Sequence, residues 1–176
     1  MDYGKLAVEL HEAAVKKGFW AVDDALVKHC AKMLSELGEV VQADRADIMY
    51  EVERDGAKPE GVAAELADFV MMALDFCAEV EANLNAILGV STYGEFAYMM
   101  QDDIIPLSTP EFVLHLQTAF SRMSSPEDMP EFSSALMVIC YGTRMWLEDR
   151  GYNLEALIRE KMAYNASRPK LHGRLY

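Results

Sequence analysis

The chain has 176 residues, of which 52% are hydrophobic, and its formal net charge is −13 at pH 7. This length and apolar content suit one folded domain over residues 1–176 and argue against disorder. The negative charge argues against binding to nucleic-acid polymers, which requires concentrated lysine and arginine. Since no apolar stretch reaches the ~20 residues of a membrane span, we also expect no membrane partner.

The cellular compartment is indicated by two features. The N-terminal residues lack the basic segment and apolar run of a secretory signal. The three cysteines, Cys30, Cys77 and Cys140, are isolated within apolar helical patterns, without the spacing of a zinc site or the even count of a disulfide framework. We therefore expect reduced core thiols in a cytoplasmic protein.

Apolar side chains recur at helical spacing along nearly the whole chain, which predicts an all-α fold, a helical bundle without strands. Gly18 and Gly56 are expected to end helices, and Pro59 to occupy a first turn. Ser124-Ser125-Pro126 should separate two helices, and Asn153 should cap the last one. The predicted helices cover residues 3–17, about 23–55, 59–89, 93–103, 109–123, 130–149 and 153–166.

Two pairs of acids, Glu36/Glu39 and Glu65/Asp68, are the main chemical signal. Each pair is spaced i, i+3, so both members project from one helix face, and each lies among apolar residues. Carboxylates that face an apolar interior repel one another and lose hydration, unless a cation compensates them. An all-oxygen acidic cluster is typical of Mg²⁺ or Mn²⁺ sites, which phosphate oxygens and water often complete. The pattern indicates a metal-dependent enzyme for a phosphorylated substrate; the alternative is a solvated acidic face.

Basic and amide side chains follow at helical spacing. Lys32 lies one turn before Glu36, and Lys161, Asn165 and Arg168 form one stripe at i, i+4 and i+7. We expect Lys32, Lys161 and Arg168 to contact phosphate oxygens. Asn165 should donate or accept a hydrogen bond with a sugar, base or phosphate. Alternatively, Lys32 only pairs with Glu36.

Hydrolysis of a phosphoanhydride requires an aligned water and stabilisation of the charge that develops on oxygen. Glu39 is the favoured acceptor of the water's proton, and Glu36 and Lys32 complete the expected catalytic set.

Three further residues have more than one interpretation each. Trp20 is expected to stack on a base, or else to be a core or interface tryptophan. His172, followed by Arg174, lies in a tail after Pro169 that either closes over the site or only aids solubility. Asp75, two turns beyond Asp68, is an additional ligand, a partner of a ligand, or a structural hydrogen-bond acceptor.

The chain resembles the MazG-like nucleotide pyrophosphohydrolases of the all-α NTP pyrophosphatase superfamily. The resemblance covers about residues 11–88 and 129–174. It depends on Glu36-x-x-Glu39, a gap of 25 residues and Glu65-x-x-Asp68. It also depends on a C-terminal segment of the KMxYNxxRPxxHG type, on His11 and on Lys17-Gly18-Phe19-Trp20.

This resemblance implies a bundle of the all-α NTP pyrophosphatase type that binds Mg²⁺, or Mn²⁺ as a substitute, through Glu36, Glu39, Glu65 and Asp68. It implies hydrolysis of a nucleoside triphosphate to the monophosphate and pyrophosphate. If the chain is an internally duplicated pseudo-dimer, it is similar to the dimeric dUTPases of the same superfamily, which makes dUTP or a related pyrimidine dNTP a substrate candidate. Because many relatives build the bundle from two chains, it also implies a homo-oligomer, a dimer or tetramer.

An internal repeat is a further hypothesis, with copies at about 23–88 and 110–165. Three of the four acids would then correspond to Arg122, Ser125 and Ser134, which leaves one acidic cluster in a pseudo-dimer with one decayed half. The alternative is that any two amphipathic helices align this well.

Three other functions are alternatives to nucleoside triphosphate hydrolysis. A di-iron carboxylate bundle is disfavoured because the chain lacks the Glu-x-x-His ligand set. A phosphoribosyl-ATP pyrophosphohydrolase would share the acidic core, and a non-catalytic helical binding or regulatory protein would keep the bundle without turnover.

Overall fold

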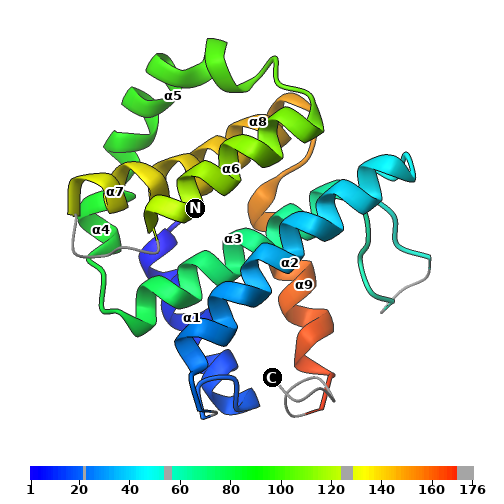
Figure 1. Ribbon diagram of the computed structural model, residues 1–176, viewed down its shortest axis with the longest axis vertical. Helices are drawn as coiled ribbons and strands as arrows, with labels where there is room; N and C mark the ends of the chain where they lie inside the picture. The colour runs from blue at the N-terminus through cyan, green and yellow to red at the C-terminus, as the bar shows by residue number, and fades with distance from the viewer. Residues whose placement is uncertain (22, 54–56, 124–128, 170–176) are drawn as a thin grey trace.

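The computed structural model describes residues 1–21, 23–53, 57–123 and 129–169 (Figure 1). The described part is all-helical, as predicted; its β-pairing is limited to an isolated antiparallel bridge between Glu51 and Glu60. A π-helical segment, η1 (Val138–Gly142), joins α7 to α8. The α-helices are α1 (Tyr3–Lys17), α2 (Ala25–Arg45), α3 (Val62–Glu79), α4 (Leu84–Ile87), α5 (Val90–Ile104), α6 (Thr109–Met123), α7 (Met129–Met137), α8 (Thr143–Asp149) and α9 (Leu154–Ala166).

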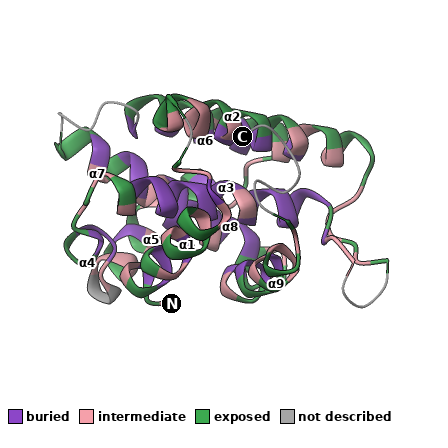
Figure 2. Cartoon of the chain, turned by 90° about the horizontal axis from the view of Figure 1, so that it is seen from below, coloured by how far each residue is buried: buried purple, intermediate pink, exposed green. Residues whose placement is uncertain are grey.

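Helix α3 is the centre of the molecule. Nearly all of its residues are buried, as the purple ribbon of α3 shows in Figure 2. Helices α1, α2, α8 and α9 and segment η1 all pack against it. A helix that is apolar on all sides is stable only inside a protein, and each large side chain such as Phe69 or Phe76 contributes roughly 1.5–3 kcal/mol on burial. The polar residues of α3 are therefore few, and the acids Glu65, Asp68 and Asp75 share one side of the helix.

The other helices pack around this centre and against one another. Helix α2 contacts both α3 and α6, and α6 also packs against α7 and η1 (Figure 1). Helix α5 contacts η1 and α8, and α9 lies along α3 and α8. No helix in the described residues has the length and apolar character that crossing a bilayer requires.

Several predicted helix ends are confirmed, since short-range chemistry determines them. Asp2 caps α1 through a hydrogen bond that its side chain accepts from the Lys5 backbone N–H at 3.0 Å. Gly18, with a φ of 86°, ends the same helix. The Asn153 side chain accepts from the Ala156 N–H at 2.9 Å, and α9 ends at Ala166 as predicted.

The second and third helices were predicted too long. Helix α2 ends at Arg45, not near Asp55, because Asp47 adopts a positive φ of 59° and the chain turns back. The carbonyls of Ile48 and Met49 then accept hydrogen bonds from the first N–H groups of α3, those of Val62 and Ala63, at 3.0 and 2.9 Å.

This loop satisfies donors that any helix start leaves open. It also places the start of α3 at Val62 and not at Pro59.

The far end of the third predicted helix also differs from the prediction. Helix α3 stops at Glu79, where Glu81 takes a positive φ of 54°, and α4 is separate. Helix α5 is longer than the predicted 93–103. The expected stop at Gly56 and the break at 124–126 lie outside the described residues.

Gly61 is required at the junction of loop and α3. Its φ is 103°, and a Cβ at this position would lie 2.9 Å from the backbone carbon and oxygen of Met49. Gly38, in the middle of α2, provides a contrast, since a Cβ there would meet no atom within 4 Å. Gly38 therefore does not serve close helix packing in this chain.

We expect Gly61→Ala to lower the free energy of unfolding by about 2 kcal/mol or more, through backbone strain and collision with Met49. The matched control, Gly38→Ala, should raise the free energy of unfolding by about 1 kcal/mol, because alanine has a higher helix propensity than glycine at an exposed position inside a helix. Urea denaturation of both variants measures this. Equal stability of the two variants would contradict the assignment.

Candidate functional site

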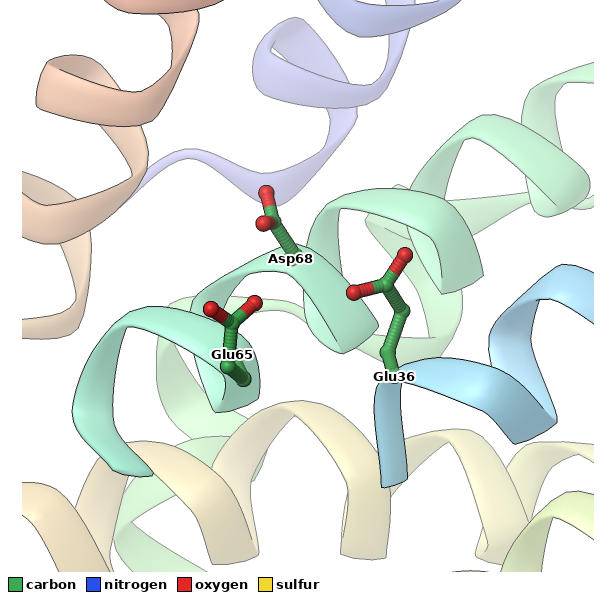
Figure 3. A group of neighbouring side chains, drawn as sticks. All are labelled: Glu36, Glu65 and Asp68. Atoms are coloured by element: carbon green, nitrogen blue, oxygen red, sulfur yellow. The ribbon is translucent and has the colours of Figure 1, made fainter. Parts of the chain in front are cut away.

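Three carboxylates converge from two helices at the centre of the molecule. Glu36 comes from the middle of α2, and Glu65 and Asp68 lie one turn apart near the start of α3 (Figure 3). One oxygen from each residue lies within 4.8 Å of the others. Glu36 and Glu65 are buried and Asp68 is partly buried. The two predicted acid pairs therefore do meet, with three of their four members in one cluster.

The fourth acid, Glu39, lies at the rim of this cluster. Its side chain is 40% exposed, and its Oε2 is 3.9 Å from the ammonium of Lys58. The hydroxyl of Ser35 donates to Glu39 Oε1 at 3.5 Å. Glu39 is thus outside the cluster of three, and its roles as metal ligand and proton acceptor stay predictions.

The electrostatics of the acid cluster favour a bound cation. The pKa of Glu36 is raised to about 7, mainly by burial. The neighbouring acids Asp68, Glu39 and Glu65 also raise this pKa, whereas the ammonium of Lys32 lowers it. Burial also raises the pKa of Glu65, against the opposing effect of Lys161. Ionised carboxylates are poorly stabilised in this position, so a cation among them would offset the loss of hydration.

Lys161, which comes from α9, provides part of that positive charge. Its side chain is only 2% exposed, and its ammonium lies 2.6 Å from Asp68 Oδ2 and 3.5 Å from Glu65 Oε2. The sequence predicted that Lys161 contacts phosphate. The structure instead places it as the buried partner of two acids, and it does not line the cleft described next.

A cleft of about 360 Å³ opens beside the acid cluster. This volume falls in the range of small-molecule sites. The predicted phosphate-binding side chains Lys32, Asn165 and Arg168 line it together with the acids. The rest of its wall is mostly apolar or basic, with Asp75 as a further acid, and is formed by Leu10, Ala13, Ala14, Lys17, Phe19, Ala25, Lys28, His29, Lys58, Met71, Met72, Asp75, Met162, Tyr164 and Ala166.

The C-terminal part of this wall is tied to α1. The Lys17 ammonium donates to the carbonyl of Ala166 at 3.0 Å and to the carbonyl of Arg168. Arg168 in turn donates to Asn165 Oδ1 at 3.4 Å. Lys32 lies 4.8 Å from the centre of the Phe19 ring, which orients its ammonium by a cation–π contact. His172 and Arg174 lie outside the described residues.

A second polar cluster surrounds Asp75 at another part of the cleft wall. His11 Nδ1 lies 2.8 Å from Asp75 Oδ1, and the Trp20 indole N–H donates to the same oxygen at 3.0 Å. His29 Nδ1 is 3.7 Å from Asp75 Oδ2, and its ring stacks on Trp20 at a centroid distance of 4.8 Å. Burial lowers the pKa of His29, although Asp75 opposes this.

These contacts bear on two sequence hypotheses. Of the roles considered for Asp75, the structure shows that of hydrogen-bond acceptor, for Trp20. Trp20 itself stacks on His29, and its contact with a base stays a prediction.

Lys58 is a member of the site that sequence reasoning missed. Its ammonium lies 3.2 Å from Glu65 Oε1, and it lines the cleft. In the sequence it lies between Gly56, the expected end of one helix, and Pro59, in the expected first turn of the next. Its position next to Pro59, seven residues before Glu65, was the available signal, since a loop that precedes the acid helix must pass close to the acids.

No protein-family model matches the chain, and no curated protein or solved structure is significantly similar to it. The resemblance to the MazG-like enzymes therefore depends on sequence motifs alone: the acid pairs, the C-terminal segment, His11 and Lys17-Gly18-Phe19-Trp20.

We expect the protein, kept free of metal by EDTA, to be more stable at pH 5.5 than at pH 8.5. The pKa of Glu36 is raised from 4.5 to about 7, so the folded state binds this proton more tightly than the unfolded state. This contribution to stability is complete below pH 4.5 and is lost as the pH rises through 7. Glu36→Gln should remove the effect and stabilise the protein at pH 8.5 by up to about 3 kcal/mol.

Urea denaturation at both pH values measures this difference. Glu12→Gln, which changes an exposed acid of α1 that does not line the cleft, is the control and should keep the wild-type slope. A Glu36→Gln variant with the same pH dependence as the wild type would show that Glu36 does not carry the effect.

Proposed function

We propose that the chain is a Mg²⁺-dependent nucleoside triphosphate pyrophosphohydrolase that acts on dNTPs. The observation that carries this proposal is the convergence of Glu36, Glu65 and Asp68 at the wall of a cleft that cationic side chains also line. Such a site combines the oxygen ligands of a hard divalent cation with groups that attract a phosphate chain.

The residues of the cluster fit a divalent cation. All three donors are carboxylates, and burial raises the pKa of two of them, Glu36 and Glu65. Two ammonium groups, those of Lys161 and Lys58, already contact Glu65. Glu36, Glu65 and Asp68 would hold the ion, with Glu39 as the proposed fourth ligand. When bound, Mg²⁺ supplies polarisation of a phosphoryl oxygen and a coordinated water of lowered pKa.

The chain's own residues would bind and orient the substrate. Lys32 and Arg168 would contact the phosphate oxygens, and Asn165 would hydrogen-bond to the sugar or to phosphate. Water adds across the phosphoanhydride between the α- and β-phosphates, which releases the monophosphate and pyrophosphate. Glu39, at the rim, would accept the proton of that water.

The length of the cleft wall suits a nucleotide. Asp75 lies seven residues beyond Asp68 on α3, which is roughly 10 Å along the helix axis. Apolar side chains, including Phe19, Met71 and Met72, line the same cleft. A nucleoside would occupy this end while its phosphates face the acids, and Trp20 belongs to the cluster at this end.

The pseudo-dimer hypothesis also gains support. Helix α2 packs with α3 and α6 packs with α7, so the two proposed copies correspond to two helix pairs. In the second pair, the equivalents Arg122, Glu131 and Ser134 are all exposed, and Ser125 lies outside the described residues. One buried acidic cluster per chain is therefore the proposed arrangement. A cytoplasmic location and assembly into a dimer or tetramer remain parts of the proposal.

The test is pyrophosphate release from a panel of NTPs, dNTPs and phosphoribosyl-ATP, with Mg²⁺ and with EDTA. We expect turnover of dNTPs that EDTA abolishes. Glu36→Gln and Asp68→Asn should each lower kcat/KM by about 10²-fold or more, since each removes a group that stabilises charge in the transition state. Preference for phosphoribosyl-ATP would instead favour that relative's reaction.

Glu12→Gln is the matched control, because Glu12 is an exposed acid of α1 that does not line the cleft. It should keep wild-type kinetics. Full activity of both Glu36→Gln and Asp68→Asn would refute the proposal, and absence of turnover on every nucleotide would favour a binding or regulatory protein.

A further inference from the structure

Glu65 is held by two ammonium groups that differ in their freedom to move. Lys161 contacts Glu65 Oε2 at 3.5 Å from the buried side, where its side chain is 2% exposed. Lys58 contacts Glu65 Oε1 at 3.2 Å, and its side chain is 36% exposed and lines the cleft. Lys161 therefore contacts Glu65 from the protein interior, and Lys58 contacts it from the side of the solvent.

The backbone that carries Lys58 is held in place beside the acids. Glu51 and Glu60 exchange two backbone hydrogen bonds of 3.0 Å, which close the loop between α2 and α3 two residues after Lys58. Pro59 is buried and restricts the backbone directly after Lys58. Because the lysine side chain is a flexible four-carbon stem, its ammonium can move while the main chain of the loop stays in place.

Lys58 is a cation that three carboxylates attract. Burial disfavours its charge, but Glu65, Glu39 and Asp68 outweigh burial and raise the pKa of Lys58 above its ordinary value. Its ammonium is 3.9 Å from Glu39 Oε2, so it lies between the cluster and the rim acid. In the absence of metal it neutralises charge on the solvent side of the cluster.

A divalent ion at the cluster must compete with these lysines for Glu65. If the Lys161 ammonium moved away, the carboxylates of Glu65 and Asp68 would lose their buried counter-charge, which is strongly unfavourable. Lys58 can swing into the cleft while it stays hydrated. Lys32 and Arg168 line the same cleft, which is where the proposed phosphate chain would lie.

We propose that Lys58 is a substrate-binding residue whose ammonium leaves Glu65 when a divalent cation binds and then contacts the phosphate chain of the nucleotide. This inference depends on the proposed function, because it assigns Lys58 to the same metal and phosphate site. It makes metal binding and phosphate binding linked events: the same lysine opposes the first and assists the second.

Lys58→Met tests the proposal, since methionine keeps the apolar stem and removes the charge. Without nucleotide, its Mn²⁺ dissociation constant, measured from the free-ion EPR signal, should fall by roughly three- to tenfold because a competing cation is gone. The KM for the dNTP that the wild type prefers should rise by about tenfold or more, because a charge-assisted contact is lost. Lys58→Arg should restore KM to within a few-fold of the wild type.

Lys16→Met, a change at an exposed lysine of α1 outside the cleft, should alter neither constant. Circular dichroism confirms that each variant is folded. Unchanged or weakened Mn²⁺ binding by Lys58→Met would overturn the inference, as would an unchanged KM. If the wild type still shows metal-dependent turnover, the proposed function survives this failure; a wild type that binds no Mn²⁺ would refute both.

Discussion

The structure depends on how a central, almost fully buried helix accommodates its own carboxylates. Helix α3 packs on all sides, yet Glu65 and Asp68 lie near its start. Three neighbouring elements place charged groups beside these acids. Helix α9 contributes the buried ammonium of Lys161 and the loop before α3 contributes that of Lys58, whereas α2 adds a third acid, Glu36. The core and the site are thus one arrangement. A substitution in either should affect both, since these contacts are shared.

Two lysines do not fully compensate three acids, and burial together with the charge of Asp68 raises the pKa of Glu36 to about 7. Removing one partner of a buried ion pair typically costs about 3–5 kcal/mol, because the other charge is left buried and unpaired, so Lys161 and Asp68 depend on each other. The same imbalance makes the cluster attractive to a divalent cation. The buried acids lower the stability of the fold, and binding of a cation to them would restore it. Strongly perturbed charged groups of this kind are common at functional sites.

The sequence predicted the features that short-range chemistry determines. Gly18 and Asn153 place helix ends through their own backbone or side chain, and the i, i+3 spacing correctly placed Glu65 and Asp68 on one face. Features that depend on contacts between distant segments were missed. The end of α2 depends on Asp47 and on carbonyls that reach α3, and the approach of Lys58 to Glu65 depends on the same loop. Lys161 was predicted to contact phosphate; its burial against Asp68 and Glu65 follows from the packing of α9 on α3, which the sequence alone does not reveal.

A crystal structure with Mn²⁺ and a non-hydrolysable dNTP analogue, collected for the anomalous signal of manganese, would test whether the acid cluster binds a divalent metal. We expect a peak about 2.0–2.2 Å from oxygens of Glu36, Glu65 and Asp68, a distance close to that of Mg²⁺ sites. A phosphate oxygen should lie in the same coordination shell. Nucleotide bound elsewhere, or a cluster without a manganese peak and with Lys58 still on Glu65, would contradict this expectation.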